Sequence, residues 1–479
     1  MTYKASILAT LLTLTVDVAL VSAADWPQFR GPDGLGVSAS NGVPLEFGPD
    51  KNVVWKTPLP PGHSSPVLTE DRIFLTAYDD QALLTFCLDR ETGKILWRRE
   101  SPRSRTEIFQ QTNGPASPSP VTDGTNVYVF FGDFGLLSYG PDGEERWRLP
   151  LGPFDNVNGH GSSPILADGM LILICDQDHD SYVIAVDQKT GKVLWKTERP
   201  EVSRGYATPG IYRPKDEPAE VIVPGAYVII SYDLATGKKL WWVTGMAWQL
   251  KSVPIVDGDT IYISGWEVGG DPGQEKPAPL PFTEILAKHD ANKDGVLSRE
   301  EAPDPRMQRE HSWNETDFDN DGVLDESDWD FYIAKSTAKN NVIAVRPQGR
   351  RGDISETGVL WRYRRGLPNT PSPLLYNSIL WLVKDGGIAT SLDPTNGRLI
   401  KQARLPDAID KYWASPVAAD GKIYMTGAGC QVSVLKPRGQ WEVLTVNNFE
   451  DQCFATPAIA DGRIYFRTMS ALYCLGKGK

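Results

Sequence analysis

The feature that most constrains the fold is a repeat that recurs eight times along the chain. Seven copies place a proline seven residues before an apolar residue of a predicted strand, and a looser copy begins at Pro209. Three copies end in the turn Asp-x-x-Thr-Gly followed by a tryptophan, as at Asp89, Gly93 and Trp97. Such units must stack, because one of them cannot cover its own faces. The regular copies begin at Pro66, Pro120, Pro164, Pro254, Pro373, Pro416 and Pro457.

Each copy has the pattern of a four-stranded antiparallel sheet. In the first copy, turn residues separate strands predicted at residues 66–68, 72–77, 83–88 and 94–97. The last copy stops after three strands at Leu475, and residues 53–56 supply the missing fourth strand. Pairing of these two chain ends would leave no free sheet edge. The sequence therefore predicts an all-β fold, an eight-bladed β-propeller closed by its N-terminal strand.

The turn and tryptophan pattern resembles the repeat of the quinoprotein-like (PQQ-like) β-propellers. That family includes alcohol dehydrogenases and the propeller lipoprotein of the outer-membrane barrel-assembly machinery. The resemblance covers roughly residues 50–475 apart from one insert. It implies a propeller that is either a quinone-dependent oxidoreductase or a scaffold without a cofactor. In both cases we expect each repeat tryptophan to pack between neighbouring blades.

Residues 1–24 have the pattern of a secretory signal peptide: an early lysine, a short apolar run and small residues before the cleavage site. No cysteine stands at that site, so we expect an exported protein, periplasmic or extracellular, without a lipid anchor or a membrane span. Residues 25–50 form an N-terminal extension that Trp26 and Phe29 should anchor to the ring, with Arg30 as a weaker candidate for a ligand contact. The propeller then occupies residues 51–268 and 339–479.

Charge and cysteine content narrow the partners and the compartment. A net charge of -12 argues against binding to nucleic acid or to an anionic membrane surface. One disulfide would fit an odd number of cysteines, but most of them lie in apolar strand runs, so we expect buried free thiols instead. The five are Cys87, Cys175, Cys430, Cys453 and Cys474.

The insert at residues 281–338 interrupts the fifth copy and carries 15 acidic and 6 basic residues. Helical spacing at its start leads into a twelve-residue loop with the complete EF-hand pattern. Oxygen side chains occupy positions 1, 3, 5 and 9, a glycine stands at 6, a backbone carbonyl serves at 7 and a glutamate at 12. The predicted calcium ligands are Asp290, Asn292, Asp294, Val296, Ser298 and Glu301.

A second loop of the same kind begins 27 residues later and has Asp328 at position 12. The shorter aspartate reaches a cation less readily with both oxygens, so this site would bind calcium more weakly or admit Mg²⁺. Leu297 and Leu324 should pair the two loops across a short β-bridge. We predict two calcium ions with a structural role, although a sensory role stays open. The second set of ligands is Asp317, Asp319, Asp321, Val323, Asp325 and Asp328.

The loops that enter the inner strands should converge on the central channel, where a ligand pocket commonly forms. One position in these loops, three or four residues before the repeated proline, differs from blade to blade. A ring of mixed polar residues around a wet channel is equally compatible with this variation. The candidates for acid–base or hydrogen-bonding chemistry are His63, His160, Tyr206, Lys251, Asn369 and Trp413, with Ser117 and Phe454 at the two remaining positions.

Catalytic signatures of the resembling dehydrogenases are missing. Those enzymes carry adjacent cysteines beside the quinone and a Glu-Asn-Asp set that holds its calcium, and this sequence has neither. We therefore do not expect bound PQQ. The favoured hypothesis is a monomeric binding or scaffold protein with calcium in its insert and an unidentified protein, glycan or small-molecule ligand. The alternative is an exported quinoprotein-like oxidoreductase or a carbohydrate-active enzyme that works in the channel.

Overall fold

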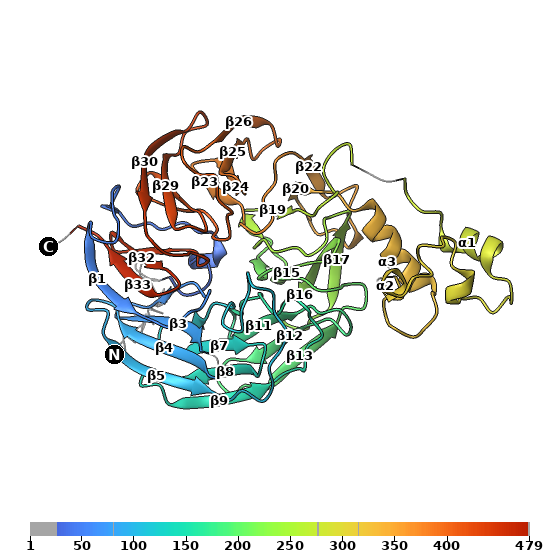
Figure 1. Cartoon of the computed structure of the whole chain (residues 1–479), viewed down its shortest axis with the longest axis horizontal. Helices are drawn as coiled ribbons and strands as arrows, with labels where there is room; N and C mark the ends of the chain where they lie inside the picture. The colour runs from blue at the N-terminus through green and yellow to red at the C-terminus, as the bar shows by residue number, and fades with distance from the viewer. Residues whose placement is uncertain (1–25, 80, 275–276, 315, 478–479) are drawn as a thin grey trace, which may run out of the picture.

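The computed structural model describes residues 26–79, 81–274, 277–314 and 316–477. The predicted signal peptide, residues 1–24, lies outside these ranges. Within them, 33 strands form eight sheets arranged in a ring around a central axis (Figure 1). Among these residues no helix has the length and apolar character to cross a membrane. The predicted eight-bladed β-propeller is confirmed.

Blades 1 to 4 follow one another along the chain, and within each blade successive strands pair antiparallel. Blade 1 contains β2 (Val67–Leu68), β3 (Arg72–Tyr78), β4 (Leu83–Asp89) and β5 (Ile95–Ser101). Blade 2 contains β6 (Val121–Thr122), β7 (Val127–Phe131), β8 (Gly135–Tyr139) and β9 (Glu145–Pro150). Blade 3 contains β10 (Ile165–Ala167), β11 (Met170–Cys175), β12 (Tyr182–Asp187) and β13 (Val193–Glu198). Blade 4 contains β14 (Gly210–Tyr212), β15 (Glu220–Gly225), β16 (Val228–Asp233) and β17 (Lys239–Thr244).

Blades 5 to 8 complete the ring. Blade 5 contains β18 (Ile255–Asp257), β19 (Thr260–Gly265), β20 (Asn341–Val345) and β22 (Val359–Tyr363). Blade 6 contains β23 (Leu374–Tyr376), β24 (Ile379–Lys384), β25 (Ile388–Leu392) and β26 (Leu399–Arg404). Blade 7 contains β27 (Val417–Ala419), β28 (Lys422–Thr426), β29 (Gln431–Lys436) and β30 (Glu442–Asn448). Blade 8 contains β31 (Ala458–Ala460), β32 (Arg463–Arg467), β33 (Ala471–Leu475) and β1 (Val53–Pro58).

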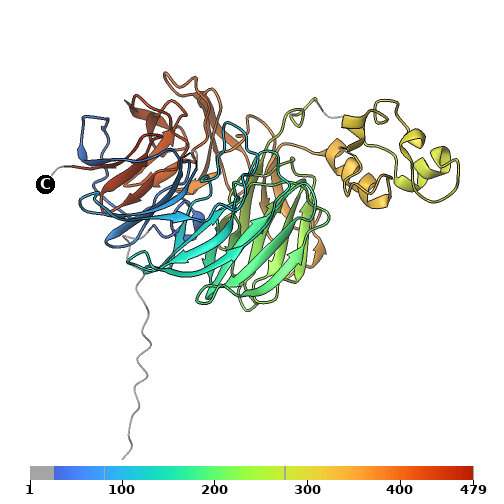
Figure 2. The ribbon, with the colours of Figure 1, turned by 60° about the horizontal axis from the view of Figure 1, so that its bottom comes forward.

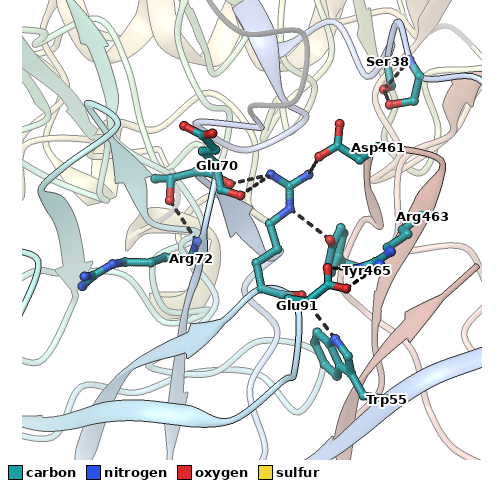
Figure 3. Close-up of polar contacts among 11 residues, drawn as sticks. Ser38, Trp55, Glu70, Arg72, Glu91, Asp461, Arg463 and Tyr465 are labelled. Atoms are coloured by element: carbon teal, nitrogen blue, oxygen red, sulfur yellow. Dashed lines mark hydrogen bonds and ion pairs between the residues drawn. The ribbon is translucent and has the colours of Figure 1, made fainter. Parts of the chain in front are cut away.

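The two ends of the propeller meet in blade 8, where β1 pairs antiparallel with β33 and Lys56 lies opposite Tyr473. The seam with blade 1 carries ion pairs (Figure 3). Arg463 contacts both oxygens of Glu91, at 2.7 and 3.1 Å. On the same seam Arg90 donates to Asp461 at 2.8 Å. Backbone pairing within the blade and side-chain pairing across the seam thus hold the chain ends together.

Repeat tryptophans join neighbouring blades, as the sequence predicts. The Trp97 indole N–H of blade 1 donates to the carbonyl of Pro141 in the turn of blade 2, at 2.9 Å. A Cβ at Gly143 of that turn would lie 2.8 Å from the same indole, and φ there is 79°. Glycine is needed at this position because the backbone is left-handed and the ring lies against it. The same contact recurs between Trp361 and Gly397.

Blade 4 departs from the predicted four strands because a short edge strand, β21 (Gly352–Asp353), pairs parallel with β17. It comes from the connection between β20 and β22 of blade 5. The Trp241 indole N–H of blade 4 donates to the buried Glu220 carboxylate at 2.6 Å, whereas Trp97 and Trp361 donate to turn carbonyls of the next blade. The extra strand and the changed tryptophan contact both occur where blade 5 packs against blade 4.

A belt of hydroxyl groups encircles the channel at the Ser or Thr before each repeated proline. In each link, the backbone N–H at this position donates to the hydroxyl of the next blade. Val253 occupies the position in blade 5 and has no hydroxyl, so no link enters it from blade 4. The acceptors in the seven links are Ser119, Ser163, Thr208, Ser372, Ser415, Thr456 and Ser65, at 2.9 to 3.1 Å.

The insert between β19 and β20 projects from the rim of the ring, and its last helix lies closest to the blades (Figures 1 and 2). It has its own small core, which includes Phe282, Leu297, Leu324 and Trp329. Its helical elements are α1 (Phe282–His289), η2 (Arg299–Glu301), α2 (Glu310–Asn314) and α3 (Glu326–Thr337).

The expectation of free thiols is wrong for two of the five cysteines. Cys430 and Cys453 form a disulfide, which ties a turn of blade 7 to the loop that enters blade 8. The remaining three, Cys87, Cys175 and Cys474, are free and buried. The sequence could not reveal this pair, because the two partners lie 23 residues apart and meet only after the blades stack.

Candidate functional site

A cavity of about 820 Å³ occupies the centre of the ring. Its lining includes six of the seven belt hydroxyl residues, all but Ser65, and parts of the loops that enter the inner strands. Seven of the eight blade-variable positions from the sequence lie on its wall. These are His63, Ser117, Tyr206, Lys251, Asn369, Trp413 and Phe454.

The N-terminal extension crosses one face of the ring and contributes Phe29 to the cavity wall. It begins at Trp26, which is buried and pairs with Leu68 of blade 1. It continues to Val37, which bridges to Ala418 of blade 7. Between these ends, the short helix η1 (Pro32–Gly34) contacts β14 of blade 4, so the extension crosses the ring, and the predicted anchoring by Trp26 is confirmed.

Arg30 holds the middle of this extension and is fully buried. Its guanidinium donates to the carbonyls of Gly34, Leu35, Ser372 and Pro373, at 2.6 to 3.3 Å. Burial lowers the pKa of Arg30 to about 9. The weaker sequence hypothesis, a ligand contact at Arg30, is wrong. The guanidinium instead donates to backbone carbonyls and holds the extension in place.

Stacked aromatic rings form one side of the cavity. His63 lies against Phe454 with ring centroids 4.1 Å apart and an angle of 18° between the planes. Trp413 continues the stack, 6.3 Å from Phe454 at 19°. Burial lowers the pKa of His63 to about 4, so this imidazole is neutral at pH 7. The Cys430–Cys453 disulfide directly precedes Phe454 and fixes the loop that carries it.

The opposite side carries an amine in a sheltered position. Lys251 Nζ donates to Asn369 Oδ1 at 3.1 Å and lies 5.8 Å from the centre of the Tyr206 ring. Burial lowers the pKa of Lys251 to about 8, while Glu267 opposes that shift. Burial also raises the pKa of Glu267. The backbone N–H of Trp248 donates to the Glu267 carboxylate at 2.7 Å and opposes this shift. Within the described lining, Glu267 is the only carboxylate.

The insert supplies part of the wall, which sequence reasoning missed. Tyr332, Lys335 and Ser336 lie on successive turns of α3 and border the cavity, together with Ala338 beyond its end. A topological signal was available. The connection between the second and third strands of an antiparallel blade emerges at the same end as the loops that enter the inner strands. An insert in that connection must therefore leave the ring beside the cavity.

His160 does not line the central cavity, contrary to its place among the sequence candidates. Its ring packs 4.2 Å from Phe154 and 5.5 Å from Phe130, and its side chain is buried. Burial lowers the pKa of His160 to about 3, and neither ring nitrogen has a hydrogen-bond partner among the described residues. The His160 ring packs against the apolar Phe154 of its own loop, and Asn158 of the same loop lines the cavity instead.

The two acidic loops of the insert fold alike. At position 1, Asp290 accepts from the Gly295 N–H, and Asp317 accepts from the Gly322 N–H, each at 3.1 Å. The glycines at position 6 have φ values of 88° and 91°. The predicted bridge is confirmed, because Leu297 and Leu324 exchange two backbone hydrogen bonds of 2.9 and 2.8 Å.

Position 12 closes each loop in the same way. Glu301 accepts from the backbone N–H groups of Ala291 and Ser298, at 2.9 Å each. Asp328 accepts from Phe318 at 2.6 Å and from Asp325 at 3.1 Å. The shorter aspartate therefore makes the same kind of backbone contacts as the glutamate.

The second loop gathers carboxylates at a distance that suits a cation. One oxygen from each of Asp317, Asp319 and Asp321 lies within 4.8 Å of the others. Asp317 is 3% exposed, and its Oδ1 is buried without a hydrogen-bond partner among the described residues. A buried carboxylate oxygen without a partner is costly unless a cation or water satisfies it.

Fold and cavity together define the class: an eight-bladed β-propeller with a ligand-sized central cavity. The profile of the family "Outer membrane protein assembly factor BamB" matches residues 47–175 and 179–270. No curated protein matches the sequence.

Solved structures with the same fold are distant in sequence. BamB from Moraxella catarrhalis is 12% identical with a TM-score of 0.54, over 89% of this chain and 98% of that one. A europium-containing methanol dehydrogenase is 10% identical with a TM-score of 0.56, over 94% and 91%. The quinohemoprotein alcohol dehydrogenase ADHIIG from Pseudomonas putida HK5 is 12% identical with a TM-score of 0.57, over 95% and 80%. At these identities the likeness concerns the fold alone.

Proposed function

We propose that this protein is an exported, calcium-binding β-propeller that binds a small ligand in its central cavity and does not act as a catalyst. The observation that carries the proposal is the cavity itself, whose wall takes a different side chain from nearly every blade. A symmetric scaffold gains specificity for a ligand when its loops differ in this way.

The ligand class follows from the charge and shape of the wall. Among the described lining residues, Lys251 and Lys335 provide two cations and Glu267 provides one carboxylate. Aromatic rings at Trp413 and Phe454 suit the faces of sugar rings or other flat groups. A volume of about 820 Å³ lies within the range of small-molecule sites, about 300–1,000 Å³. We infer an acidic saccharide or a comparable ring compound that carries carboxylates.

Binding is favoured over catalysis because the described lining lacks paired acid–base groups. Glycoside hydrolysis needs two carboxylates on either side of the bond, and Glu267 stands alone. The dehydrogenases that this chain resembles hold the quinone's calcium with carboxylates, which a single glutamate does not supply. His63 is neutral and stacked on Phe454, which suits it to contact a ligand.

Calcium is proposed for both loops of the insert. The first loop offers Asp290, Asn292, Asp294, Ser298 and Glu301, which are all oxygen donors of the kind that calcium prefers. The second loop offers the Asp317 cluster with its unpartnered oxygen. Extracellular calcium sites of this kind bind with Kd values on the order of 10⁻⁴ to 10⁻³ M.

Export is supported by the leader-like pattern of residues 1–24 and by the disulfide. Disulfides persist in oxidising compartments such as the periplasm and the extracellular space, and they are rare in the cytosol. The Cys430–Cys453 pair therefore agrees with export.

Intrinsic tryptophan fluorescence tests the ligand proposal, because Trp248, Trp266 and Trp413 line the cavity. Trigalacturonic acid is titrated into the calcium-loaded protein, and PQQ with calcium is titrated in parallel. We expect saturable quenching by the acidic saccharide that Lys251→Met weakens at least tenfold. Lys189→Met, in an exposed turn of blade 3, is the matched control and should bind like wild type.

Two results would contradict the proposal. One is that the acidic saccharide does not bind. The other is that PQQ binds stoichiometrically and confers dye-reducing activity on an alcohol, which would make the protein a quinoprotein oxidoreductase.

A further inference from the structure

Helix α3 connects the second acidic loop directly to the central cavity. Asp328, the last residue of the loop, is the third residue of α3. Tyr332, Lys335 and Ser336 follow in the same helix and border the cavity. A rigid helix of this length transmits a displacement at one end to the other, because its backbone hydrogen bonds resist bending. The last ligand position of the second loop and part of the cavity wall therefore belong to one helix.

Aromatic contacts form a second connection between the loop and the ring. Phe318, at position 2 of the loop, stacks on Phe331 of α3 with centroids 4.0 Å apart and planes at 12°. Phe331 in turn meets Tyr227 of blade 4 edge-on at 5.4 Å. Tyr227 lines the cavity. A shift of Phe318 would thus displace Phe331 and, through it, Tyr227 of the cavity wall.

The second loop is also fastened to the propeller at its tip. Asn320 Nδ2 lies 2.9 Å from His179 Nε2, in the loop between β11 and β12 of blade 3. The same His179 ring lies 6.2 Å from Phe318. The docked position of α3 consequently depends on the conformation of the loop that precedes it.

The loop conformation should depend on a cation. The Asp317, Asp319 and Asp321 carboxylates lie within 4.8 Å of one another. Like charges at this distance repel, and a bound divalent cation reverses that repulsion. The buried, unpartnered Oδ1 of Asp317 is a second and independent sign that the loop is shaped for a ligand.

We propose that cation binding at the second loop holds α3 in place as a wall of the central cavity, so that cation binding and ligand binding are positively coupled. The proposal rests on the cation site and the ligand cavity of the proposed function. It assigns Tyr332 and Lys335 as ligand contacts supplied by the insert. Linkage requires the effect to be reciprocal, and couplings of this kind commonly change an affinity by about 5- to 150-fold.

The first test uses calcium alone and needs no ligand. Hydrogen–deuterium exchange of the full chain is measured with and without calcium, after chelation. We expect calcium to protect the loop, residues 326–338 and the segment around Tyr227. Asp317→Asn with Asp319→Asn should remove the protection at all three places. Asp290→Asn with Asp294→Asn is the matched control, and it should leave residues 326–338 protected.

A relay variant separates the coupling from the cation site. Phe331→Leu should retain calcium binding at the second loop, measured by isothermal titration, while protection around Tyr227 is lost. Trigalacturonic acid should bind about tenfold more weakly to the Asp317→Asn, Asp319→Asn protein than to wild type. In wild type, the saccharide should lower the calcium Kd by the same factor.

The outcomes distinguish the two proposals. Calcium binding that protects only residues 290–325 would overturn the coupling and leave the calcium site intact. A wild-type protein that takes up no calcium at the second loop would overturn both. Equal saccharide affinity with and without calcium, when calcium does bind, would also overturn the coupling.

Discussion

The backbone N–H of Thr456 donates to Ser65 Oγ at 2.9 Å and so joins the last repeat of the chain to the first. It belongs to the hydroxyl belt that surrounds the channel, and it lies next to the cavity wall. Because β1 pairs with β33 in the same blade, the ring is closed near its axis as well as at its outer edge.

Replacing Ser65 with alanine should leave the Thr456 N–H without its partner in a buried position. A buried unsatisfied donor costs about 1–3 kcal/mol, so the free energy of unfolding should fall by that amount. Chemical denaturation measures the change. Ser336→Ala, on the half-buried face of α3, is the control and should alter stability by less than about 0.5 kcal/mol. An unchanged stability for Ser65→Ala would show that the belt does not contribute.

Removing the Cys430–Cys453 disulfide should destabilise the closing region and release the loop that carries Phe454. Loss of a native disulfide typically costs about 2–5 kcal/mol. We therefore expect a lower thermal midpoint in Cys430→Ala with Cys453→Ala, and the same midpoint for wild type in reductant. Cys87, Cys175 and Cys474 provide an internal control, because reductant should not shift the midpoint of the double variant.

Affinity for an acidic ligand should decrease as the pH rises through about 8. Burial lowers the pKa of Lys251 to about 8, so the amine loses its charge in this range. For each pH unit above the pKa, a ligand affinity that requires the charged amine falls by up to about tenfold. Titrations at pH 7, 8 and 9 measure the slope. Lys251→Arg should bind with little pH dependence, and an identical slope in that variant would exclude Lys251 as the titrating group.

The same pKa shift affects stability with a defined sign. The folded-state pKa of Lys251 is lower than the unfolded value of 10.5, so between about pH 8 and pH 10.5 the unfolded chain binds more protons. The Lys251 contribution to the free energy of unfolding therefore rises with pH across this window. Lys251→Met should show a smaller rise than wild type.

Replacing His160 with leucine should leave ligand affinity unchanged and reduce acid sensitivity. Burial lowers the pKa of His160 to about 3, below the unfolded value of 6.5, so its contribution to stability is lost as the pH falls below 6.5. Between pH 6.5 and 4.5, this loss lowers the free energy of unfolding by about 2–3 kcal/mol. Denaturation at both pH values should show a smaller loss for His160→Leu than for wild type. A large drop in ligand affinity would instead restore His160 as a site residue.

Local sequence patterns predict the ring of blades, whereas the remaining features of the fold and the site depend on tertiary contacts. The proline and tryptophan repeats specify eight blades because each repeat supplies one inner strand and one inter-blade contact. The loop position that varies from blade to blade finds seven lining residues of the cavity. His160 is the exception, because Phe154 in its own loop offers an apolar pocket that no repeat rule describes.

Other parts of the site depend on segments that are distant in sequence. Arg30 meets Ser372 and Pro373, more than 340 residues away, and no local signal specifies that contact. Strand β21 and the wall formed by α3 both arise where blade 5 departs from the repeat. Sequence reasoning located that irregularity but did not predict how the extra segments would pack on the ring.

The most direct test of the central claim is a crystal structure of the protein with calcium and trigalacturonic acid. The account predicts the saccharide in the central cavity, with a carboxylate within hydrogen-bond distance of Lys251 Nζ and a second contact to Lys335, and a cation between Asp317, Asp319 and Asp321. Saccharide bound elsewhere, or an empty cavity beside an occupied second loop with α3 displaced from the ring, would contradict it.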